Sequence, residues 1–182
     1  MVKEDPRLMT GMFHDRASAE RAYQCAMGRG YTSDDVSLLM SEDARNRHFP
    51  KDDPRRTELG TKAAEGAGVG AIAGGGLGAV LAGMAAAGIA VPGLPIIAMG
   101  TLAAAVTGAL TGGGLGAIVG ALIGHGIPRE RAEQYEEGIR RGGIVMGVTP
   151  RTRDDAEYLE REWTACGGEQ IYCPTWRARD AA

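Results

Sequence analysis

The residue types that most often carry catalysis are sparse in this chain. Its three histidines are far apart, and none has a second ligand at the spacing of a metal site: His14, His48 and His125. No side-chain nucleophile stands in a recognisable order with a base. The sequence therefore predicts no catalytic residue, no bound metal and no enzyme activity.

The chain has three cysteines and no Cys-x-x-Cys pair: Cys25, Cys166 and Cys173. That spacing favours neither a zinc site nor a disulfide framework. The first residues lack the apolar stretch of a signal peptide, which indicates a cytoplasmic start and reduced thiols. Cys25 could oppose Cys166 or Cys173 within the folded protein, although buried structural thiols are the commoner case.

One segment is similar to a dinucleotide-binding motif. Residues 68–73 (GVGAIA) have the Gly-x-Gly-x-x-Ala spacing, but the motif needs a preceding strand and the charged segment 61–65 stands there instead. No Gly-x-x-x-x-Gly-Lys-Ser/Thr loop occurs that could cradle a phosphate. The glycines of 68–73 also belong to a longer series. We therefore expect no cofactor.

Charge and glycine are distributed unevenly. The 182 residues have a formal net charge of -3, which gives no electrostatic reason to expect a nucleic-acid partner. From Gly66 to Gly124, 59 residues carry no charged side chain, and this stretch holds 18 of the 29 glycines. The chain is thus a polar sequence with an apolar insert at its centre.

Small residues recur at every fourth position of the insert, which places them on one helical face and lets another backbone approach closely. Two such series lie on either side of a turn at 91–95 (VPGLP), and Pro95 suits the start of the second helix. The sequence therefore predicts a glycine-zipper helical hairpin over 61–126. Its helix-packing residues are Gly66, Gly70, Gly74, Gly78, Gly108, Gly112, Gly116, Gly120 and Gly124.

The surroundings of this hairpin admit two interpretations. Either helix is long enough for a hydrocarbon core of about 30 Å, and basic residues on both flanks match a hairpin with both termini in the cytoplasm. Its apolar content is diluted by glycine and alanine, however, which makes insertion into lipid marginal. The expected partners are therefore other copies of the chain together with a lipid bilayer, at the cytoplasmic membrane. The alternative is a cytoplasmic homo-oligomer that buries the hairpins in a central bundle.

The flanks predict two matching units. In the first, an apolar run at 8–14 precedes a helix with Asp15 as its cap, and a second strand follows at 36–40. In the second, a strand at 143–148 precedes a helix over 154–166, with Trp163 inward, and a strand at 170–173. This order predicts an α+β fold, a ferredoxin-like sandwich whose split β-α-β halves form one antiparallel sheet with two helices on one face.

The chain therefore divides into six parts. We assign 1–43 to the first half of the ferredoxin-like domain, 44–60 to a charged linker, 61–126 to the hairpin, 127–142 to a connecting amphipathic helix, 143–176 to the second half and 177–182 to a tail. In the connecting helix, Ala132, Tyr135 and Ile139 form a narrow apolar stripe. That stripe either docks on the sandwich or lies at a membrane surface.

Two segments are similar to a known family. Residues 12–40 (MFHDRASAERAYQCAMGRGYTSDDVSLLM) resemble the N-terminal module of bacterial general stress proteins with a YflT-like domain. In a common variant, a glycine-zipper stretch follows, and then a strand–helix–strand unit similar to residues 143–171. The resemblance implies a stress-associated bacterial protein without an established enzyme activity or cofactor, and it transfers no site residues.

Together these patterns predict a non-enzymatic stress-response protein whose glycine-zipper hairpin drives helix packing, oligomerisation and membrane association. A soluble homo-oligomer is the first alternative. The second is a regulatory module that binds a small molecule of unknown identity, which rests on fold analogy alone.

Overall fold

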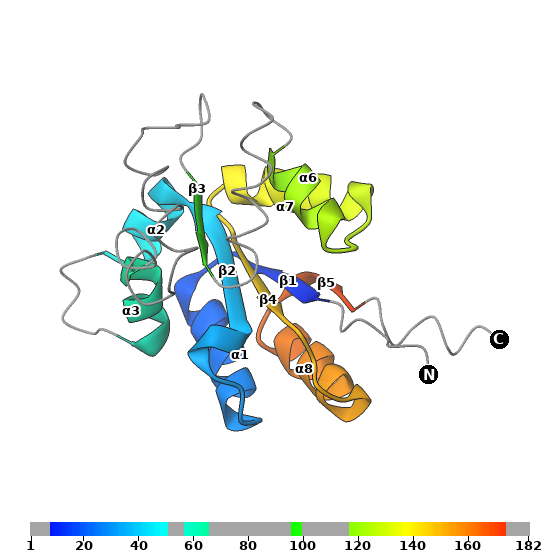
Figure 1. Ribbon diagram of the computed structural model, residues 1–182. Coiled ribbons are helices and arrows are strands. Elements are labelled where there is room, and N and C mark those ends of the chain that lie inside the picture. The colour runs from blue at the N-terminus through cyan, green and yellow to red at the C-terminus, as the bar shows by residue number, and fades with distance from the viewer. Residues whose placement is uncertain (1–7, 51–56, 66–95, 100–116, 174–182) are drawn as a thin grey trace, which may run out of the picture.

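The strands predicted on either side of the insert form one sheet. The computed structural model of the protein describes residues 8–50, 57–65, 96–99 and 117–173 (Figure 1). In chain order its elements are β1 (Met9–Phe13), α1 (Arg16–Gly28), η1 (Ser33–Asp35), β2 (Val36–Ser41), α2 (Glu42–His48), α3 (Glu58–Glu65), β3 (Ile96–Met99), α6 (Ala117–Gly124), α7 (Arg129–Arg140), β4 (Ile144–Val148), α8 (Arg153–Ala165) and β5 (Glu169–Tyr172). Helices and an open antiparallel sheet confirm the α+β class.

The sheet has the order β3-β2-β4-β1-β5, and all of its strand pairs are antiparallel. β4, which follows the insert in the chain, lies between β1 and β2, so that Val148 stands opposite both Met9 and Val36. β5 pairs with β1 at one edge, with a shift in register between Thr10 and Met12. β3 pairs with β2 at the other edge. The second half of the chain therefore joins the two strands of the first.

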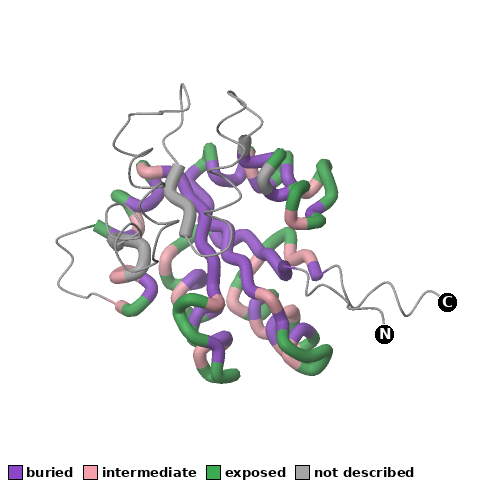
Figure 2. Tube along the Cα trace, in the orientation of Figure 1, coloured by how far each residue is buried: buried purple, intermediate pink, exposed green. Residues whose placement is uncertain are grey.

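Helices cover both faces of the sheet, since α1 and α8 lie on one side and α6 and α7 on the other (Figure 1). Alternate strand residues serve the two faces. Those in the core with α1 and α8 are Met9, Phe13, Val36, Leu38, Met40, Ile144, Met146 and Val148. Those in the core with α6 and α7 are Met12, Leu39 and Val145. Because both sides are covered, β1, β2 and β4 are buried throughout (Figure 2) and their sequences are almost continuously apolar.

Trp163, predicted to point inward, ties α8 to α1 and β1. Its indole Nε1 donates a hydrogen bond to the Ala22 carbonyl oxygen at 3.1 Å, and its ring meets Phe13 edge to face with 5.7 Å between centroids. A Cβ atom on Gly11 would lie 3.1 Å from the Trp163 ring, so this glycine makes room for the indole. The largest buried side chain thus bridges the two halves of the domain.

The connecting helix docks on the sheet as α7. The predicted apolar stripe is confirmed, because it is buried against the sheet and does not remain open for a membrane surface. Its residues are Ala132, Tyr135 and Ile139. The Tyr135 hydroxyl lies 3.0 Å from Thr10 Oγ1 in β1 and donates to the Gln170 carbonyl oxygen in β5 at 2.5 Å. Burial raises the pKa of Tyr135 to about 12. Gly138 permits the close approach, because a Cβ there would collide with the Met12 side chain.

The prediction for residues 96–99 is wrong. The hairpin model starts its second helix at Pro95, but Ile96–Met99 form β3 and pair with β2 from Ser41↔Ile96 to Leu38↔Met99. Two adjacent β-branched isoleucines favour extended backbone, and the outer side of β2 offers unpaired backbone groups to a fifth strand. The rest of the predicted zipper at 66–95 and 100–116 lies outside the described residues.

The prediction of a solvated linker over 44–60 is also wrong in part. The Ser41 hydroxyl accepts a hydrogen bond from the Ala44 amide at 3.1 Å and caps α2, and α3 begins at Glu58. Phe49 and Leu59 are buried in the core shared with α1. These two apolar side chains hold an otherwise highly charged segment against the domain.

The helices of the described residues include none with both the length and the apolar character needed to cross a membrane.

We expect Gly168→Ala to destabilise the protein by about 1–3 kcal/mol, because overpacking in a core forces neighbouring atoms apart. A Cβ at this position would lie 2.7 Å from the Trp163 carbonyl oxygen and 2.9 Å from the Phe13 ring. Urea denaturation measures the change. Gly28→Ala is the matched control, since its Cβ would meet no atom within 4 Å, and it should leave stability unchanged or higher. Equal stability of the two variants would contradict the packing described here.

The pairing of β3 predicts a specific response to proline. A proline cannot donate a backbone hydrogen bond. In an edge strand, the backbone N–H groups of neighbouring residues point alternately toward the sheet and away from it. The double variant Ile97→Pro/Ala98→Pro must therefore remove a hydrogen bond of the β2–β3 ladder. Hydrogen exchange should then become faster at β2 amides that face β3, while β4 stays protected. Leu94→Pro, outside β3, is the control. Unchanged exchange in β2 would restore the helical prediction for this segment.

Candidate functional site

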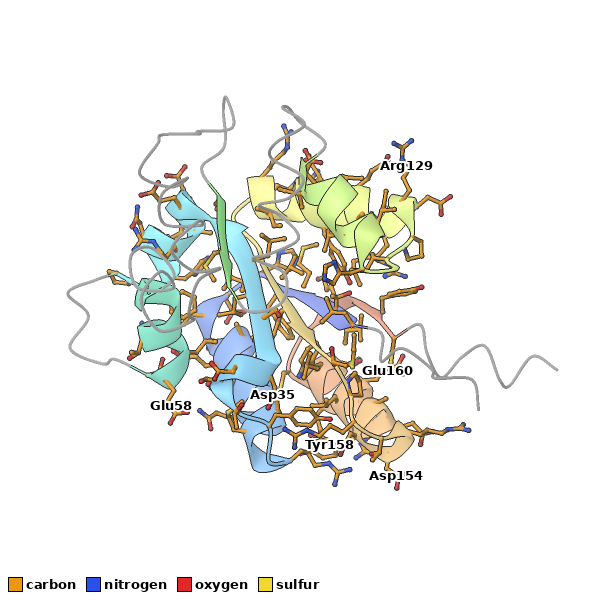
Figure 3. All side chains as sticks on the ribbon, in the orientation of Figure 1. Asp35, Glu58, Arg129, Asp154, Tyr158 and Glu160 are labelled. Atoms are coloured by element: carbon orange, nitrogen blue, oxygen red, sulfur yellow. The ribbon has the colours of Figure 1, made fainter. Side chains whose placement is uncertain are left out.

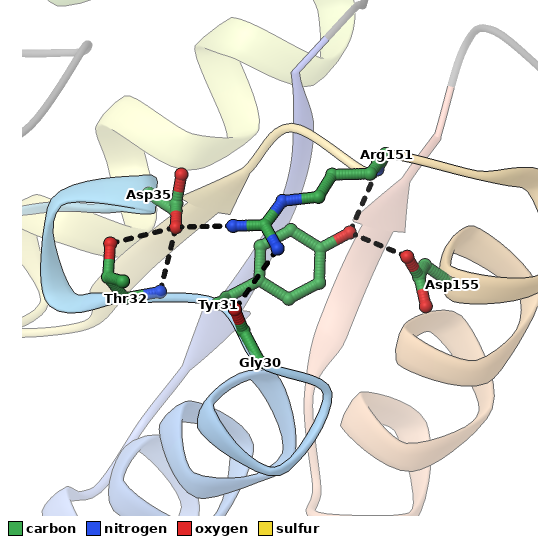
Figure 4. A network of polar contacts seen from close by, with 6 residues as sticks. All are labelled: Gly30, Tyr31, Thr32, Asp35, Arg151 and Asp155. Carbon is green, nitrogen blue, oxygen red and sulfur yellow. Dashed lines mark hydrogen bonds and ion pairs between the residues drawn. The ribbon is translucent and has the colours of Figure 1, made fainter.

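A network of charged and aromatic side chains joins the two halves of the domain at one end of the sheet (Figure 4). It involves the loop after α1 and the loop before α8, which are more than a hundred residues apart in the sequence. Asp35, Asp154 and Tyr158 mark this end of the molecule (Figure 3). We call the set of Arg29, Tyr31, Thr32, Asp35, Arg151 and Asp155 the clasp.

Arg151 provides most of the links. Its Nη2 donates to Asp35 Oδ2 at 2.9 Å, and its Nη1 donates to the Gly30 carbonyl oxygen at 3.0 Å. The guanidinium also lies over the Tyr31 ring, with 4.4 Å from Cζ to the ring centroid. Arg151, from the second half, thus binds three residues of the first half: Asp35 through an ion pair, Gly30 through a hydrogen bond and Tyr31 through a cation–π contact.

Tyr31 and Asp155 form the other side of the clasp. The Tyr31 hydroxyl accepts a hydrogen bond from the Arg151 amide at 2.8 Å and donates to Asp155 Oδ2 at 3.1 Å. Asp155 also pairs with Arg29, whose Nε lies 3.1 Å from Oδ1. Burial raises the pKa of Tyr31 further above neutral pH, where a tyrosine hydroxyl already keeps its proton and can donate.

Both loops carry the same four-residue pattern, Thr-x-Asp-Asp, at 32–35 and 152–155. The Thr152 hydroxyl accepts from the Asp155 amide at 3.1 Å and starts α8, and Asp35 accepts from the amide and hydroxyl of Thr32. These Thr32 donors, followed by Arg151, hold the pKa of Asp35 below its usual range. Both aspartate pairs thus lie in a first helical turn, Asp34–Asp35 in η1 and Asp154–Asp155 in α8.

The clasp is built to join segments. Its main donors and acceptors satisfy one another, and Asp155 and Asp35 each already bind an arginine. Sequence reasoning missed Arg151 and Tyr31 because neither belongs to a periodic apolar pattern. The repeated Thr-x-Asp-Asp pattern marks both loops in the sequence, but it does not predict that the two loops lie together in the fold.

The described parts of the insert attach to the domain at two places, β3 at the sheet edge and α6 on α7. α6 buries Ile118, Val119 and Leu122 in the core that it shares with α7. Two predicted zipper residues, Gly120 and Gly124, lie on its exposed side, and a Cβ on Gly124 would meet no atom within 4 Å. Ile123, beside them, is 41% exposed. The zipper side of α6 is therefore not used in its packing on α7.

The remaining candidate residues are not brought together. Gly66, Gly70, Gly74, Gly78, Gly108, Gly112 and Gly116 lie outside the described residues. His14 lies 3.0 Å from Glu169, and His48 lies 3.3 Å from the Gly142 carbonyl oxygen, so the two histidines serve separate contacts. In the part of the chain that the structure describes, no three His, Cys, Asp or Glu side chains gather as a metal site. Two of the cysteines, Cys25 and Cys166, do come into contact.

Comparison with known proteins finds no matching family model, no similar curated protein and no similar solved structure.

Tyr31→Phe should lower the free energy of unfolding by about 1–2 kcal/mol, because it removes two hydrogen bonds between the halves and leaves the Arg151 amide and Asp155 without that partner. Thermal and urea denaturation measure the loss. Tyr158→Phe is the matched control: its ring contacts Arg29 and Arg161 by cation–π interactions that phenylalanine retains, and the change should stay within about 0.5 kcal/mol. A Tyr31 variant as stable as this control would show that the clasp contributes nothing.

Proposed function

We propose that this protein is a non-enzymatic, stress-associated protein that self-associates through its glycine-rich insert. The resemblance of residues 12–40 and 143–171 to general stress proteins with a YflT-like domain supports the association with stress. The regular spacing of small residues in the insert supports close packing between helices.

We further propose that the flanks form a ferredoxin-like module that holds the insert. The strand order β2-β4-β1-β5, with α1 and α8 together on one face, is the order that two interlocked β-α-β halves would produce. β3 and the α6–α7 pair are additions to this plan. In this proposal the module is the support, and the insert carries the function.

The observation that carries the proposal is the position of β3. Because Ile96–Met99 pair with β2, the chain returns to the domain in the middle of the insert. About 30 residues lie between α3 and β3, and about 17 lie between β3 and α6. Both glycine-rich segments are therefore tethered to the domain at each end, and their reach is limited by their length.

This limit favours one surrounding for the zipper. If each segment leaves and returns as two helical passes at 1.5 Å per residue, the first extends about 22 Å and the second about 13 Å. A hydrocarbon core is about 30 Å thick. Two passes across a bilayer thus need more residues than either segment has, whereas packing against another copy of the protein sets no such minimum length. The geometry supports a homo-oligomer more strongly than a membrane-spanning hairpin.

Membrane association is the second candidate, favoured by the absence of charge from Gly66 to Gly124. A bilayer could take up these segments as shallow, non-spanning elements, with both termini in the cytoplasm. Cell fractionation distinguishes the two candidates. A complex of defined mass that stays in the supernatant without detergent supports the homo-oligomer, and carbonate-resistant pelleting supports the membrane.

Bulky replacements on the zipper face should dissociate the assembly. We expect Gly74→Leu/Gly112→Leu to shift the mass measured by light scattering from the oligomer toward the monomer, because two backbones can no longer approach closely. Circular dichroism and thermal denaturation should show the domain still folded. Ala79→Leu adds the same side chain outside the four-residue series and should keep the parental mass. If the double variant kept the mass and the membrane partition of the parent, self-association through the zipper would be wrong.

A further inference from the structure

Two of the three cysteines meet where the halves of the domain pack on each other. Cys25 lies in the last turns of α1, and Cys166 is the residue at which α8 ends. The two side chains lie beside each other where α1 packs on the end of α8, although most of the chain separates them in the sequence. The third cysteine, Cys173, is buried elsewhere in the core, beyond α8.

Several contacts fix the register of α1 against the end of α8 on this side. Arg21, one turn before Cys25, donates from Nη2 to the Cys166 carbonyl oxygen at 3.2 Å. The Trp163 indole binds the Ala22 carbonyl oxygen. Two hydrogen bonds thus hold the turns of α1 and α8 that carry Cys25 and Cys166 next to each other.

The pair is accessible to small reagents. Both cysteines are partly exposed, whereas Cys173 is 3% exposed. Burial, followed by the neighbouring Cys166 and Glu162, raises the pKa of Cys25 to about 11. Because the two thiols lie beside each other, whichever is oxidised first has the other placed to react with the product.

We propose that Cys25 and Cys166 form a reversible oxidation site, in which a hydroperoxide converts the two thiols into a disulfide across the α1–α8 interface. The thiolate of one cysteine attacks a peroxide oxygen, the O–O bond breaks, and the departing oxygen takes up a proton and leaves as water or an alcohol. That cysteine then carries a sulfenic acid. The sulfur of the other cysteine attacks this sulfur, the S–S bond forms, the S–O bond breaks, and water leaves with the proton of the second thiol. The thiols lose two electrons, and the peroxide gains them.

The disulfide would change the domain in a defined way. It would join α1 in the first half to α8 in the second and close a loop that contains the entire insert. A cross-link over so long a loop restricts the unfolded chain far more than the folded one. Oxidation thus locks together two halves that otherwise depend on the sheet, the Trp163 contact and the clasp. This inference does not depend on self-association through the zipper.

The test treats the reduced full-length protein with hydrogen peroxide. Alkylation under denaturing conditions should fall from three reactive thiols to one, and peptide mapping should identify a Cys25–Cys166 disulfide. The melting temperature should rise by about 5–15 °C and return after treatment with a dithiol reductant. Cys173→Ser should retain both responses. Cys25→Ser and Cys166→Ser should each lose the disulfide and the shift in melting temperature.

The opposite results are as clear. Three thiols remaining after peroxide, a cross-link that uses Cys173, disulfides only between separate chains, or a sulfinic acid at Cys25 or Cys166 in the parent protein would each overturn the proposal. If Cys25→Ser or Cys166→Ser fails to fold, the peptide maps of the parent protein and of the Cys173→Ser variant still decide the question. Mass measurements of the Gly74→Leu/Gly112→Leu variant test self-association separately, since they do not involve these cysteines.

Discussion

The fold depends on the central position of β4. β1 and β2, the two strands of the first half, do not pair with each other, and β4 pairs with each of them over five residues. Neither half can form a sheet of its own, because a single strand leaves its backbone groups unpaired. The Trp163–Ala22 contact and the clasp link the same two parts of the chain on the helical side. The sheet accommodates the insert because it lies in the sequence between β2 and β4, which are neighbours in the sheet.

The strands and helices of the two β-α-β units follow closely from local sequence. Strands at 9–13, 36–41, 144–148 and 169–172 and helices at 16–28 and 153–165 differ from the predicted bounds by only a few residues. Local signals suffice here, because Asp15 and Thr152 cap their helices and glycines with positive φ, such as Gly30 and Gly167, end them. Periodicity then identifies the inward side of each helix, as with Ala22 and Trp163.

What local sequence does not contain is the choice of partner. Ile96–Met99 is a short apolar run that fits a helix or a strand, and only the open side of β2 decides between them. The apolar stripe of α7 was recognisable, but its place against Met12 and Thr10 was not, and Gly138 is required only by that contact. Arg151 is likewise an ordinary loop arginine until Asp35 and Gly30 lie beside it. The candidate site is made of such distant pairs, so sequence analysis did not find it.

The strand order also has a consequence for the newly made chain. At about 5–20 residues per second, the ribosome needs roughly 5–20 s to proceed from β2 to β4. During that interval β1 and β2 have left the exit tunnel without the strand that separates them in the native sheet. β3 emerges about halfway through and can already cover one side of β2. The added edge strand can thus cover one side of an incomplete sheet during translation, while unpaired strand edges can still pair with neighbouring polypeptides.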